Sequence, residues 1–220
     1  MGLERPAKRM TDVMLASIGL ALLSPLLAVV AVALKLGSPG PVLYRGARVG
    51  HSGRLFHILK FRTMVVDAER LGGSATADDD PRLTRIGLFL RKYKLDELPQ
   101  LLNVLKGDMS LVGPRPEVKR LVDTYSPEER RVLEVRPGIT DWASIWDMDE
   151  GAVLRTQADA EAAYRAFILP AKIRLQLLYV ERQSWAEDMR VLFHTGMRLF
   201  RRSWVPREIA NMAPPKCHRI

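Results

Sequence analysis

The longest hydrophobic segment of the sequence lies near its amino terminus. Residues 13–34 carry no charged side chain. As a straight helix these 22 residues would span about 33 Å, which is enough to cross a hydrocarbon core of roughly 30 Å. The apolar region of a cleaved signal peptide is shorter, at about 7 to 15 residues. The pattern therefore predicts a helix in the membrane, with a buried core helix as the alternative.

Ser24 and Pro25, near the middle of this segment, predict a bend in the helix. Proline has no backbone N–H, and its ring collides with the carbonyl four residues earlier, so a helix must kink or break there. In lipid the carbonyl that loses its hydrogen-bond donor needs another donor. The hydroxyl of Ser24 can help to supply one by bonding back to the preceding turn.

The charges that flank the segment indicate how it lies in the bilayer. Cations near a membrane segment mark its cytoplasmic ends, and both flanks are basic. The cations are Arg5, Lys8 and Arg9 before the segment and Lys35, Arg45, Arg48 and Arg54 after it. We therefore expect a re-entrant helix-break-helix that dips into one leaflet, with a kinked spanning helix as the alternative.

The remaining chain predicts one β-hairpin and several helices. Val42-Leu43-Tyr44 and the run Leu55–Phe61 bracket His51-Ser52-Gly53, as two strands and a turn would. Apolar positions at helical spacing predict helices over 83–92, 99–106, 127–134, 156–169, 171–183 and 185–201. The fold class is therefore α+β and mostly helical, divided into a membrane helix in 1–40, a main domain in 41–205 and a disordered basic tail in 206–220.

Two of these helices are both amphipathic and basic. Helix 83–92 mixes apolar residues with cations, and helix 185–201 carries an apolar stripe opposite a basic face. The basic face consists of Arg190, His194, Arg198 and Arg202. Such helices suit the phospholipid headgroup region. A helix that covers the core and turns its cations to water is the alternative.

The composition indicates an anionic partner. Thirty-four Lys and Arg face 25 Asp and Glu, for a formal charge of +9, which suits nucleic acid, a lipid surface or a phosphorylated substrate. No helix-turn-helix or zinc pattern is present, and the apolar segment fits poorly with a soluble nucleic-acid binder. The single cysteine, Cys217, excludes an internal disulfide and favours a reducing compartment.

The stretch Leu95-Asp96-Glu97-Leu98-Pro99 places two carboxylates at the start of a helix. Neighbouring helical side chains diverge by about 100°, so Asp96 and Glu97 should have different tasks. The positive end of the helix dipole favours an ionised carboxylate, and the free N–H groups there suit a phosphoryl group. One carboxylate can attack phosphorus to form an acyl phosphate, and its neighbour can hold Mg²⁺. Helix capping is the ordinary alternative for both residues.

Several cations suit the phosphate oxygens of such a substrate. They are Lys60, Arg62, Arg91 and Arg115. Arg115 is the best placed, because it and Gly113 both precede prolines and are thereby held in extended conformations. For each cation taken singly, surface solubility is the alternative explanation.

Together these segments resemble the bacterial sugar transferase family, the monotopic phosphoglycosyl transferases that start lipid-linked glycan assembly. The matching segments are the broken hydrophobic helix at Ser24-Pro25, Lys60-Phe61-Arg62-Thr63-Met64, Leu90-Arg91-Lys92, Leu95-Asp96-Glu97-Leu98-Pro99-Gln100, residues 107–116 and Arg136-Pro137-Gly138-Ile139-Thr140. They cover residues 8 to 141 in the family's order. No long transmembrane bundle precedes them, so the chain resembles the small form of the family.

The resemblance implies a two-step transfer at the cytoplasmic face of the bacterial inner membrane. Asp96 would attack the β-phosphate of a UDP-sugar, expel UMP and carry the phosphosugar until polyprenyl (undecaprenyl) phosphate accepts it. Glu97 would bind Mg²⁺, while Lys60, Arg62, Arg91 and Arg115 would bind phosphate or shape the site. Asp188 is a candidate for either a direct role in the site or a structural ion pair.

One segment departs from the family pattern. After Thr140 many relatives continue with Gly and then Trp-Ala-Gln-Val, whereas this chain has Asp141-Trp142-Ala143-Ser144-Ile145-Trp146. The departure leaves the identity of the sugar open. The sequence also leaves open the glycan pathway and the oligomeric state. A membrane-tethered adaptor and a hydrolase of lipid diphosphates remain the alternative functions.

Overall fold

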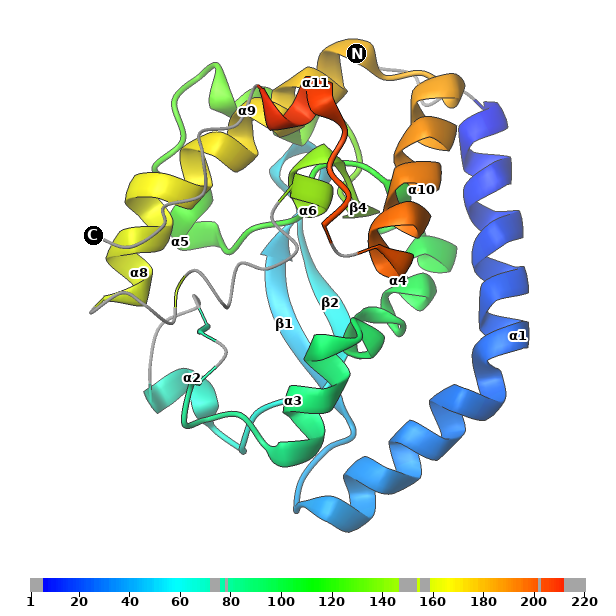
Figure 1. Cartoon of the computed structure of the whole chain (residues 1–220), viewed down its shortest axis with the longest axis vertical. Coiled ribbons are helices and arrows are strands. Elements are labelled where there is room, and N and C mark those ends of the chain that lie inside the picture. The colour runs from blue at the N-terminus through cyan, green and yellow to red at the C-terminus, as the bar shows by residue number, and fades with distance from the viewer. Residues whose placement is uncertain are drawn as a thin grey trace.

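The long amino-terminal helix α1 (Pro6–Gly37) bends about halfway along its length (Figure 1). The computed structural model describes residues 6–71, 76–77, 79–146, 154, 159–201 and 203–211. Pro25 lies inside α1, and the hydroxyl of Ser24 donates to the carbonyl of Ala21 at 2.8 Å. Ala21 is the residue whose carbonyl Pro25 deprives of its donor. The predicted compensation by Ser24 is thus confirmed, and α1 bends as one helix instead of breaking into two.

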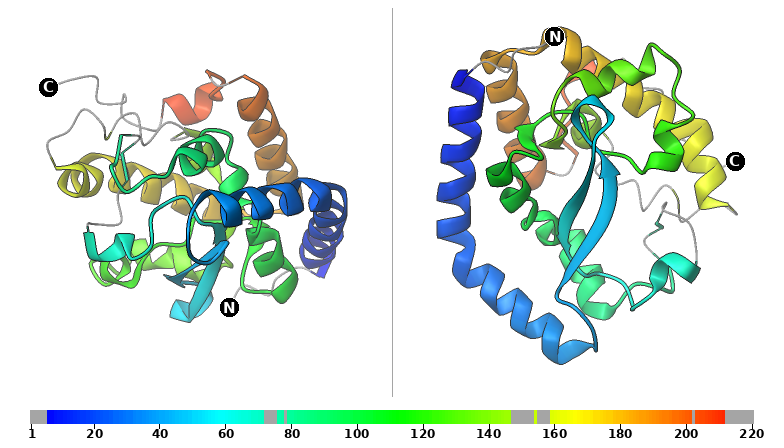
Figure 2. Two further views of the ribbon diagram at one scale, coloured as in Figure 1. Left: turned by 90° about the horizontal axis from the view of Figure 1, so that it is seen from below. Right: turned by 180° about the vertical axis from the view of Figure 1, so that it is seen from behind.

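The predicted β-hairpin is also confirmed. Strands β1 (Leu43–Val49) and β2 (Leu55–Phe61) are antiparallel, with Leu43 opposite Phe61 and Val49 opposite Leu55. The turn η1 (His51–Gly53) is a short 3-10 helix in which Ser52 and Gly53 have φ of 55° and 77°. Seen from behind, the hairpin crosses the middle of the molecule, while α1 runs along one edge and returns beneath it to reach β1 (Figure 2).

The middle of the chain consists of short elements that position Asp96, Glu97 and the loop that carries Arg115. In order these are α2 (Ala68–Leu71), α3 (Arg85–Lys92), η2 (Leu95–Glu97), α4 (Gln100–Lys106), β3 (Ser110–Val112), α5 (Lys119–Val122), η3 (Glu129–Glu134), β4 (Gly138–Thr140) and α6 (Trp142–Trp146). β3 and β4 form a parallel pair that the sequence did not indicate, since each has only three residues. The helix predicted over 127–134 is the 3-10 helix η3.

The carboxy-terminal part is helical and covers the core. It contains α8 (Ala160–Ala163), the π-helical turn η4 (Tyr164–Ile168), α9 (Leu169–Arg182), α10 (Trp185–Phe200) and α11 (Arg207–Ala210). The prediction of a disordered tail from residue 206 is wrong for α11, because Ile209 is fully buried. The rest of the predicted tail, 212–220, which includes Cys217, lies outside the described residues, as do 155–158 of the helix predicted over 156–169.

Two hydrophobic clusters hold these elements together. The larger one gathers buried side chains of β3, α6, α9 and α10 around Trp142 and Tyr179. The smaller one joins Val30 and Leu34 of α1 to Phe61 of β2 and Leu90 of α3. The second half of α1 is therefore packed on the same domain as the first half.

Polar contacts fasten the first half of α1 to β3, α9 and α10. The ammonium of Lys8 donates to Asp188 at 2.7 Å, to Tyr179 at 3.3 Å and to the carbonyl of Val112 at 3.0 Å. Asp12 accepts from the hydroxyl of Ser110 at 2.8 Å and from the amide of Leu111 at 3.0 Å. Asp188 thus forms a buried structural ion pair, which is one of its two predicted roles.

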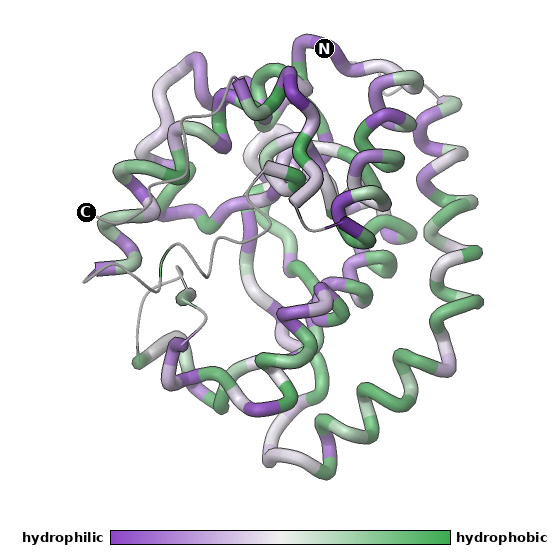
Figure 3. Tube along the Cα trace, viewed as in Figure 1, coloured by the Kyte–Doolittle hydropathy of each residue, from purple (hydrophilic) through white to green (hydrophobic). Residues whose placement is uncertain are grey.

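The remaining surface of α1 is apolar. Among the described helices α1 is the one long and apolar enough to cross a membrane, and 11% of its most apolar window is buried. Green segments follow both halves of the helix in Figure 3. Its large exposed side chains are Met10, Val13, Met14, Leu15, Ile18, Leu22, Leu26, Val29, Val32 and Leu36. This surface makes contact with a membrane plausible.

The buried pair of Lys8 and Asp188 predicts a coupled effect on stability. Replacing Lys8 with Met leaves Asp188 buried without its cation, so the free energy of unfolding in detergent should fall by about 3 to 5 kcal/mol. The double variant Lys8→Met, Asp188→Leu should recover most of that loss, because no charge is then left unpaired. The exposed pair of Lys119 and Asp123 serves as the control: Lys119→Met should change stability by less than about 1 kcal/mol. Equal losses in the single and double variants would contradict the coupling.

Candidate functional site

The two carboxylates lie in η2, between α3 and α4. Lys94 lies between the end of α3 and the start of η2 in the left-handed region, with φ 56° and ψ 21°, and so turns the chain into η2. A non-glycine residue in this region is strained, and such residues gather at functional sites. α4 then begins at Gln100 and ends at Gly107, as predicted from the sequence. Asp96 is 7% exposed, and Glu97 lies beside it, largely buried.

Glu97 is bound by two cations from other elements. The guanidinium of Arg115 donates to both of its carboxylate oxygens, one of them at 3.0 Å, and the ammonium of Lys60 donates to Oε1 at 2.9 Å. Burial alone would raise the pKa of Glu97, but Arg115 and Lys60 outweigh it and hold that pKa well below its ordinary value. Glu97 is therefore an ionised carboxylate that fixes a forked arginine and a lysine in place.

Asp96 has a different environment. Its Oδ1 atom is buried without a hydrogen-bond partner in the described part of the chain. Burial raises the pKa of Asp96, and the charge of Glu97 raises it further, while Lys60, Lys94 and Arg91 oppose the shift. We expected the helix dipole to keep this pKa low, and that expectation is wrong, because loss of hydration is the larger effect here.

The amides at the start of this helix are already used. The N–H of Glu97 donates to the carbonyl of Lys94 at 3.4 Å, and that of Leu98 donates to Leu95 at 3.3 Å. The predicted cradle of free N–H groups is therefore wrong for these two amides. The amides of Glu97 and Leu98 are therefore not free to bind phosphate oxygens.

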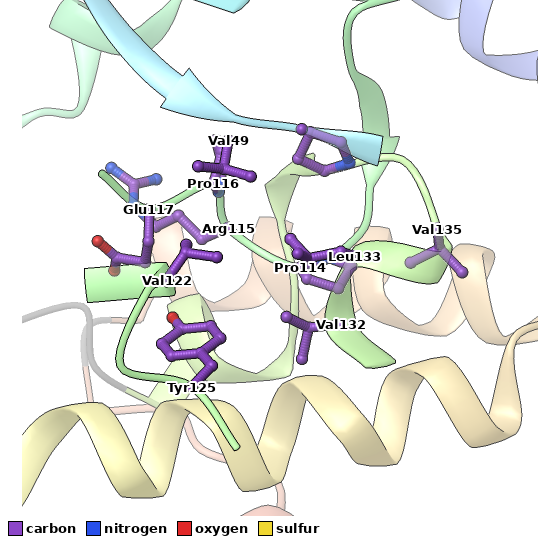
Figure 4. Close-up of a pocket in the computed structure, with 12 residues that line it drawn as sticks. Val49, Pro114, Arg115, Pro116, Glu117, Val122, Tyr125, Val132, Leu133 and Val135 are labelled. Carbon is purple, nitrogen blue, oxygen red and sulfur yellow. The ribbon is translucent and has the colours of Figure 1, made fainter. Parts of the chain in front are cut away.

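The loop that carries Arg115 is held on both sides. Its backbone N–H donates to Asp141 at 3.2 Å, and the amide of Gly113 donates to Thr140 at 3.0 Å. A Cβ atom on Gly113 would lie 2.3 Å from the carbonyl oxygen of Arg136, so only glycine fits there. On the other side the loop packs on β1, α5 and η3 around a cavity of about 10 Å³ (Figure 4). The described contacts leave this loop little room to move.

Of the other two predicted cations, Arg91 lies at the site and Arg62 has a structural role. Arg91 donates to the carbonyl of Thr76 at 3.4 Å, and its charge acts on Asp96. Arg62 instead donates to the hydroxyl of Ser38 at 2.8 Å and to the carbonyls of Ser38 and Pro39, where the chain leaves α1. The structure thus brings Lys60, Arg91 and Arg115 to the carboxylates, whereas Arg62 holds the segment that follows α1.

A larger cavity opens beside Glu97 and Arg115. Its volume is about 240 Å³, and it lies where η2, α4, β4, α6, α9 and α10 meet. Its lining residues are Lys94, Glu97, Leu98, Leu101, Arg115, Ile139, Thr140, Ala143, Ser144, Ile145, Lys172, Thr195, Arg198 and Leu199. Sequence reasoning missed Lys94, Lys172 and Arg198 as cations of a site, because nothing in their spacing connects three distant segments.

Comparison with known proteins identifies the family. The profile of the family described as bacterial sugar transferase matches residues 3–202. The chain belongs to the bacterial sugar transferase family. The resemblance found in the sequence motifs is thereby confirmed.

Two relatives show how the chain compares with longer members of the family. A UDP-N-acetylgalactosamine-undecaprenyl-phosphate N-acetylgalactosaminephosphotransferase of Aeromonas hydrophila is 48% identical over 63% of this chain and 33% of its own length. A UDP-glucose:undecaprenyl-phosphate glucose-1-phosphate transferase of Escherichia coli is 44% identical over 90% of this chain and 41% of its own length. The chain thus spans a third to two fifths of the length of these two relatives.

A relative of more similar length carries the same printed activity. The UDP-glucose:undecaprenyl-phosphate glucose-1-phosphate transferase of Caulobacter vibrioides is 38% identical over 86% of this chain and 67% of its own length. The names of these relatives contain two different sugars. The similarity therefore leaves the sugar open for this member of the family.

The segment that departs from the family pattern is mainly structural. Asp141 is fully buried, and it accepts from the amide of Ser144 at 2.6 Å as well as from that of Arg115. The indole N–H of Trp142 donates to Glu187 at 2.8 Å. Only the middle of the segment, residues 143–145, lines the larger cavity. Any influence of this segment on the substrate must therefore act through those three residues or through Arg115.

The donor groups beside the cavity fit a magnesium ion that is shared with a substrate. Among the described residues, no cluster of three or more His, Cys, Asp or Glu side chains forms a closed metal site. Mg²⁺, however, is commonly bound by one or two carboxylates together with phosphate oxygens. Asp96, with its unpartnered Oδ1, and the neighbouring Glu97 are the carboxylates that would be candidates to hold such an ion.

The opposing charges around Asp96 predict that two substitutions shift its pKa in opposite directions. In the purified protein with divalent cations removed, the carboxyl of Asp96 should titrate above its usual pKa. Glu97→Gln should lower that pKa, because it removes a negative neighbour and releases two cations, whereas Arg91→Gln should raise it. Carbon-13 NMR of labelled aspartate checks both variants. An Asp96 that titrates below its ordinary range, or shifts of the same sign in the two variants, would overturn this account.

Proposed function

We propose that this protein transfers a sugar-1-phosphate from a UDP-sugar to undecaprenyl phosphate and releases UMP. The proposal is supported by membership of the bacterial sugar transferase family and by relatives whose names state this reaction. Its physical basis is the unequal pair of carboxylates. Asp96 is buried with an unpartnered oxygen, while its neighbour Glu97 is bound by Lys60 and Arg115.

In the proposed first step Asp96 attacks the β-phosphorus of the donor. A bond forms between the Asp96 carboxylate and phosphorus, the bond to the bridging oxygen breaks, and UMP leaves with that oxygen. An ionised carboxylate with a raised pKa is a better nucleophile than an ordinary one, and Lys60, Lys94 and Arg91 favour the ionised form of Asp96. Its poor hydration favours attack, because few hydrogen bonds must be broken beforehand.

In the second step an oxygen of undecaprenyl phosphate attacks the same phosphorus. The new bond forms the lipid diphosphate-sugar, and the bond to Asp96 breaks to restore the carboxylate. Neither step requires a proton from the protein. The separate nucleophile allows UMP to leave before the lipid enters, which is a ping-pong sequence.

Lys60, Arg91 and Arg115 would bind phosphate oxygens during both steps. Arg115 and Lys60 are held in place by Glu97, so that they lie ready beside Asp96 and lose little freedom on binding. Glu97 would hold Mg²⁺ together with phosphate oxygens of the donor. Magnesium, when bound, would neutralise charge on the diphosphate.

We further propose that α1 is re-entrant and that the main domain lies on the cytoplasmic face of the bacterial inner membrane. Both halves of α1 pack on that domain, through Lys8 and Asp12 at one end and Val30 and Leu34 at the other. Its outer surface is apolar, as are exposed positions on α3 and α10. A helix that crosses the bilayer would carry one of these halves away from the domain.

The covalent step is tested by incubation with a panel of UDP-sugars and Mg²⁺ in the absence of lipid. We expect release of UMP and a sugar-phosphate increase in mass on the peptide that contains Asp96. Asp96→Asn should reduce both by at least about a thousandfold, because an amide is a poor nucleophile. Asp123→Asn, an exposed residue of a surface ion pair, is the matched control and should react as wild type does.

The alternatives give different results in the same assay. Turnover that needs undecaprenyl phosphate but never modifies Asp96 would indicate direct displacement. Free sugar phosphate released without lipid would indicate a hydrolase. If Asp96→Asn kept full function and no donor were consumed, the protein would be an adaptor.

The topology is tested with a reporter at residue 1 and another in the η1 turn. In a re-entrant arrangement both are labelled from the cytoplasmic side of inverted membrane vesicles. Pro25→Ala restores the missing N–H and should straighten α1, so that a fraction of the molecules protects the first reporter. Ser24→Ala alone is the control and should keep both reporters accessible. A first reporter that is protected in the wild-type chain would establish a spanning helix instead.

A further inference from the structure

Gln100 follows the two carboxylates in the sequence, yet neither step of the proposed reaction uses it. It is the first residue of α4, and it is 0% exposed. Both Oε1 and Nε2 of its carboxamide are buried, and within the described residues neither atom has a hydrogen-bond partner. Burying a carboxamide costs free energy unless its donors and its acceptor find partners. Packing alone therefore does not explain a glutamine at this position.

Asp96 lies one helical turn before Gln100. Leu98 and Pro99 have helical backbone angles, with φ of −55° and −61°, so η2 continues into α4. Residues four apart in a helix share one face, where aspartate and glutamine side chains can form a hydrogen bond. Oδ1 of Asp96 is likewise buried, and it has no partner in the described part of the chain. An enclosed donor and an enclosed acceptor on the same helical face are thus suited to each other.

The two oxygens of Asp96 are not equivalent. Oδ1 is the enclosed oxygen, so Oδ2 is the one left to attack phosphorus. Hydrogen bonds of catalytic groups are often long or poorly aligned in the free enzyme and tighten only in its complexes. A hydrogen bond from Gln100 to Oδ1 therefore belongs to the complexes with substrates.

The charge on Oδ1 changes during the proposed transfer. While Asp96 is ionised, Oδ1 shares its negative charge. Once Oδ2 is bonded to phosphorus, Oδ1 is the neutral carbonyl oxygen of an acyl phosphate. A hydrogen bond to an ionised oxygen is roughly twice as strong as one to a neutral oxygen. A donor at Oδ1 therefore favours the free carboxylate over the acyl phosphate.

We propose that Gln100 is a positioning residue that acts through Asp96 and favours the second step. In the substrate complexes its Nε2 donates to Oδ1. This hydrogen bond strengthens as an oxygen of the lipid phosphate bonds to phosphorus, the bond from phosphorus to Oδ2 breaks, and the electron pair of that bond returns to the carboxylate. No proton is transferred. The inference rests on the proposed function.

Gln100→Met tests this proposal, because it roughly keeps the volume of the side chain and removes the donor. Loading is measured as UMP release without lipid, at a saturating concentration of the UDP-sugar that the panel selects. Transfer is measured in a single turnover, after protein that carries the phosphosugar is mixed with undecaprenyl phosphate in detergent micelles. The rate of transfer should fall about tenfold and the KM for undecaprenyl phosphate should stay within about twofold, because the donor acts only as charge develops. Loading should not slow, and the loaded fraction at a fixed ratio of UDP-sugar to UMP should rise.

Gln176 of α9 provides the matched control, because it is also a buried glutamine, with 2% exposure. Gln176→Met removes a carboxamide from another part of the core. Its effect on stability can therefore be compared with that of Gln100→Met. Both half-reactions of Gln176→Met should stay within about twofold of the wild type.

Infrared spectroscopy of the loaded protein gives a measurement that does not depend on rates. With carbon-13 in the aspartate side chains, the carbonyl band of the acyl phosphate reports on hydrogen bonding to Oδ1. A hydrogen bond lowers the frequency of a carbonyl, so the band should lie at higher frequency in Gln100→Met than in the wild type. In the wild type it should lie below the band of an acyl phosphate model compound in aprotic solvent. This last comparison tests the proposal even where the variant does not fold.

Other results would overturn the proposal. Equal slowing of loading and transfer in Gln100→Met, or a carbonyl band at the same frequency as in the wild type, assigns Gln100 to the fold alone. A wild-type band at the frequency of the model compound excludes the hydrogen bond to Oδ1. Failure of the proposed function looks different, because the wild-type chain would then form neither an acyl phosphate nor a lipid product.

Discussion

The site depends on one carboxylate that two cations share. Glu97 of η2 is bound by Lys60 of β2 and by Arg115 of the loop after β3, so three separate parts of the chain meet at a single ionised group. A buried carboxylate is costly unless such partners neutralise it. Because Glu97 takes up these two cations, Asp96 is left with a buried oxygen that accepts no hydrogen bond from the described residues. The two neighbouring acids differ in the way that the proposed chemistry requires, and this difference follows from the ion pairs of Glu97.

Helix α1 is coupled to this arrangement through β3. Lys8 and Asp12 bind the backbone and side chains of residues 110–112, directly before the loop that carries Arg115. On the other side of β2, Arg62 ties the end of α1 to the strand that carries Lys60. Both cations that hold Glu97 are thus anchored within a few residues of contacts to α1. A movement of this helix in the bilayer would be transmitted to the site through short, stiff connections.

Local sequence rules predicted the parts of the molecule that depend on local chemistry. The bend at Pro25 follows from a residue with a restricted backbone, and the end of α4 follows from Gly107, which adopts a left-handed φ of 90° at little cost. The hairpin follows from two apolar runs on either side of a turn. The left-handed Lys94, the three-residue strands and the π-helical turn could not be predicted, because tertiary packing imposes them. The pKa of Asp96 was predicted with the wrong sign for a similar reason. The effect of the helix dipole can be predicted from the position of a residue along its helix, whereas its burial depends on which other segments pack over the side chain.

Charge is distributed in an unusual way across α10. An amphipathic helix on a membrane normally keeps its cations near the headgroups, yet Arg198 is turned into the protein, together with Lys172 from α9. Each of these two cations has an interaction inside the protein, which helps to offset the cost of its burial. The two residues that follow Arg198 turn outward instead, since Leu199 and Phe200 are 52% and 93% exposed. At this end of α10 the surface is therefore apolar because its cation is used inside the fold, and position along the helix alone could not have predicted that.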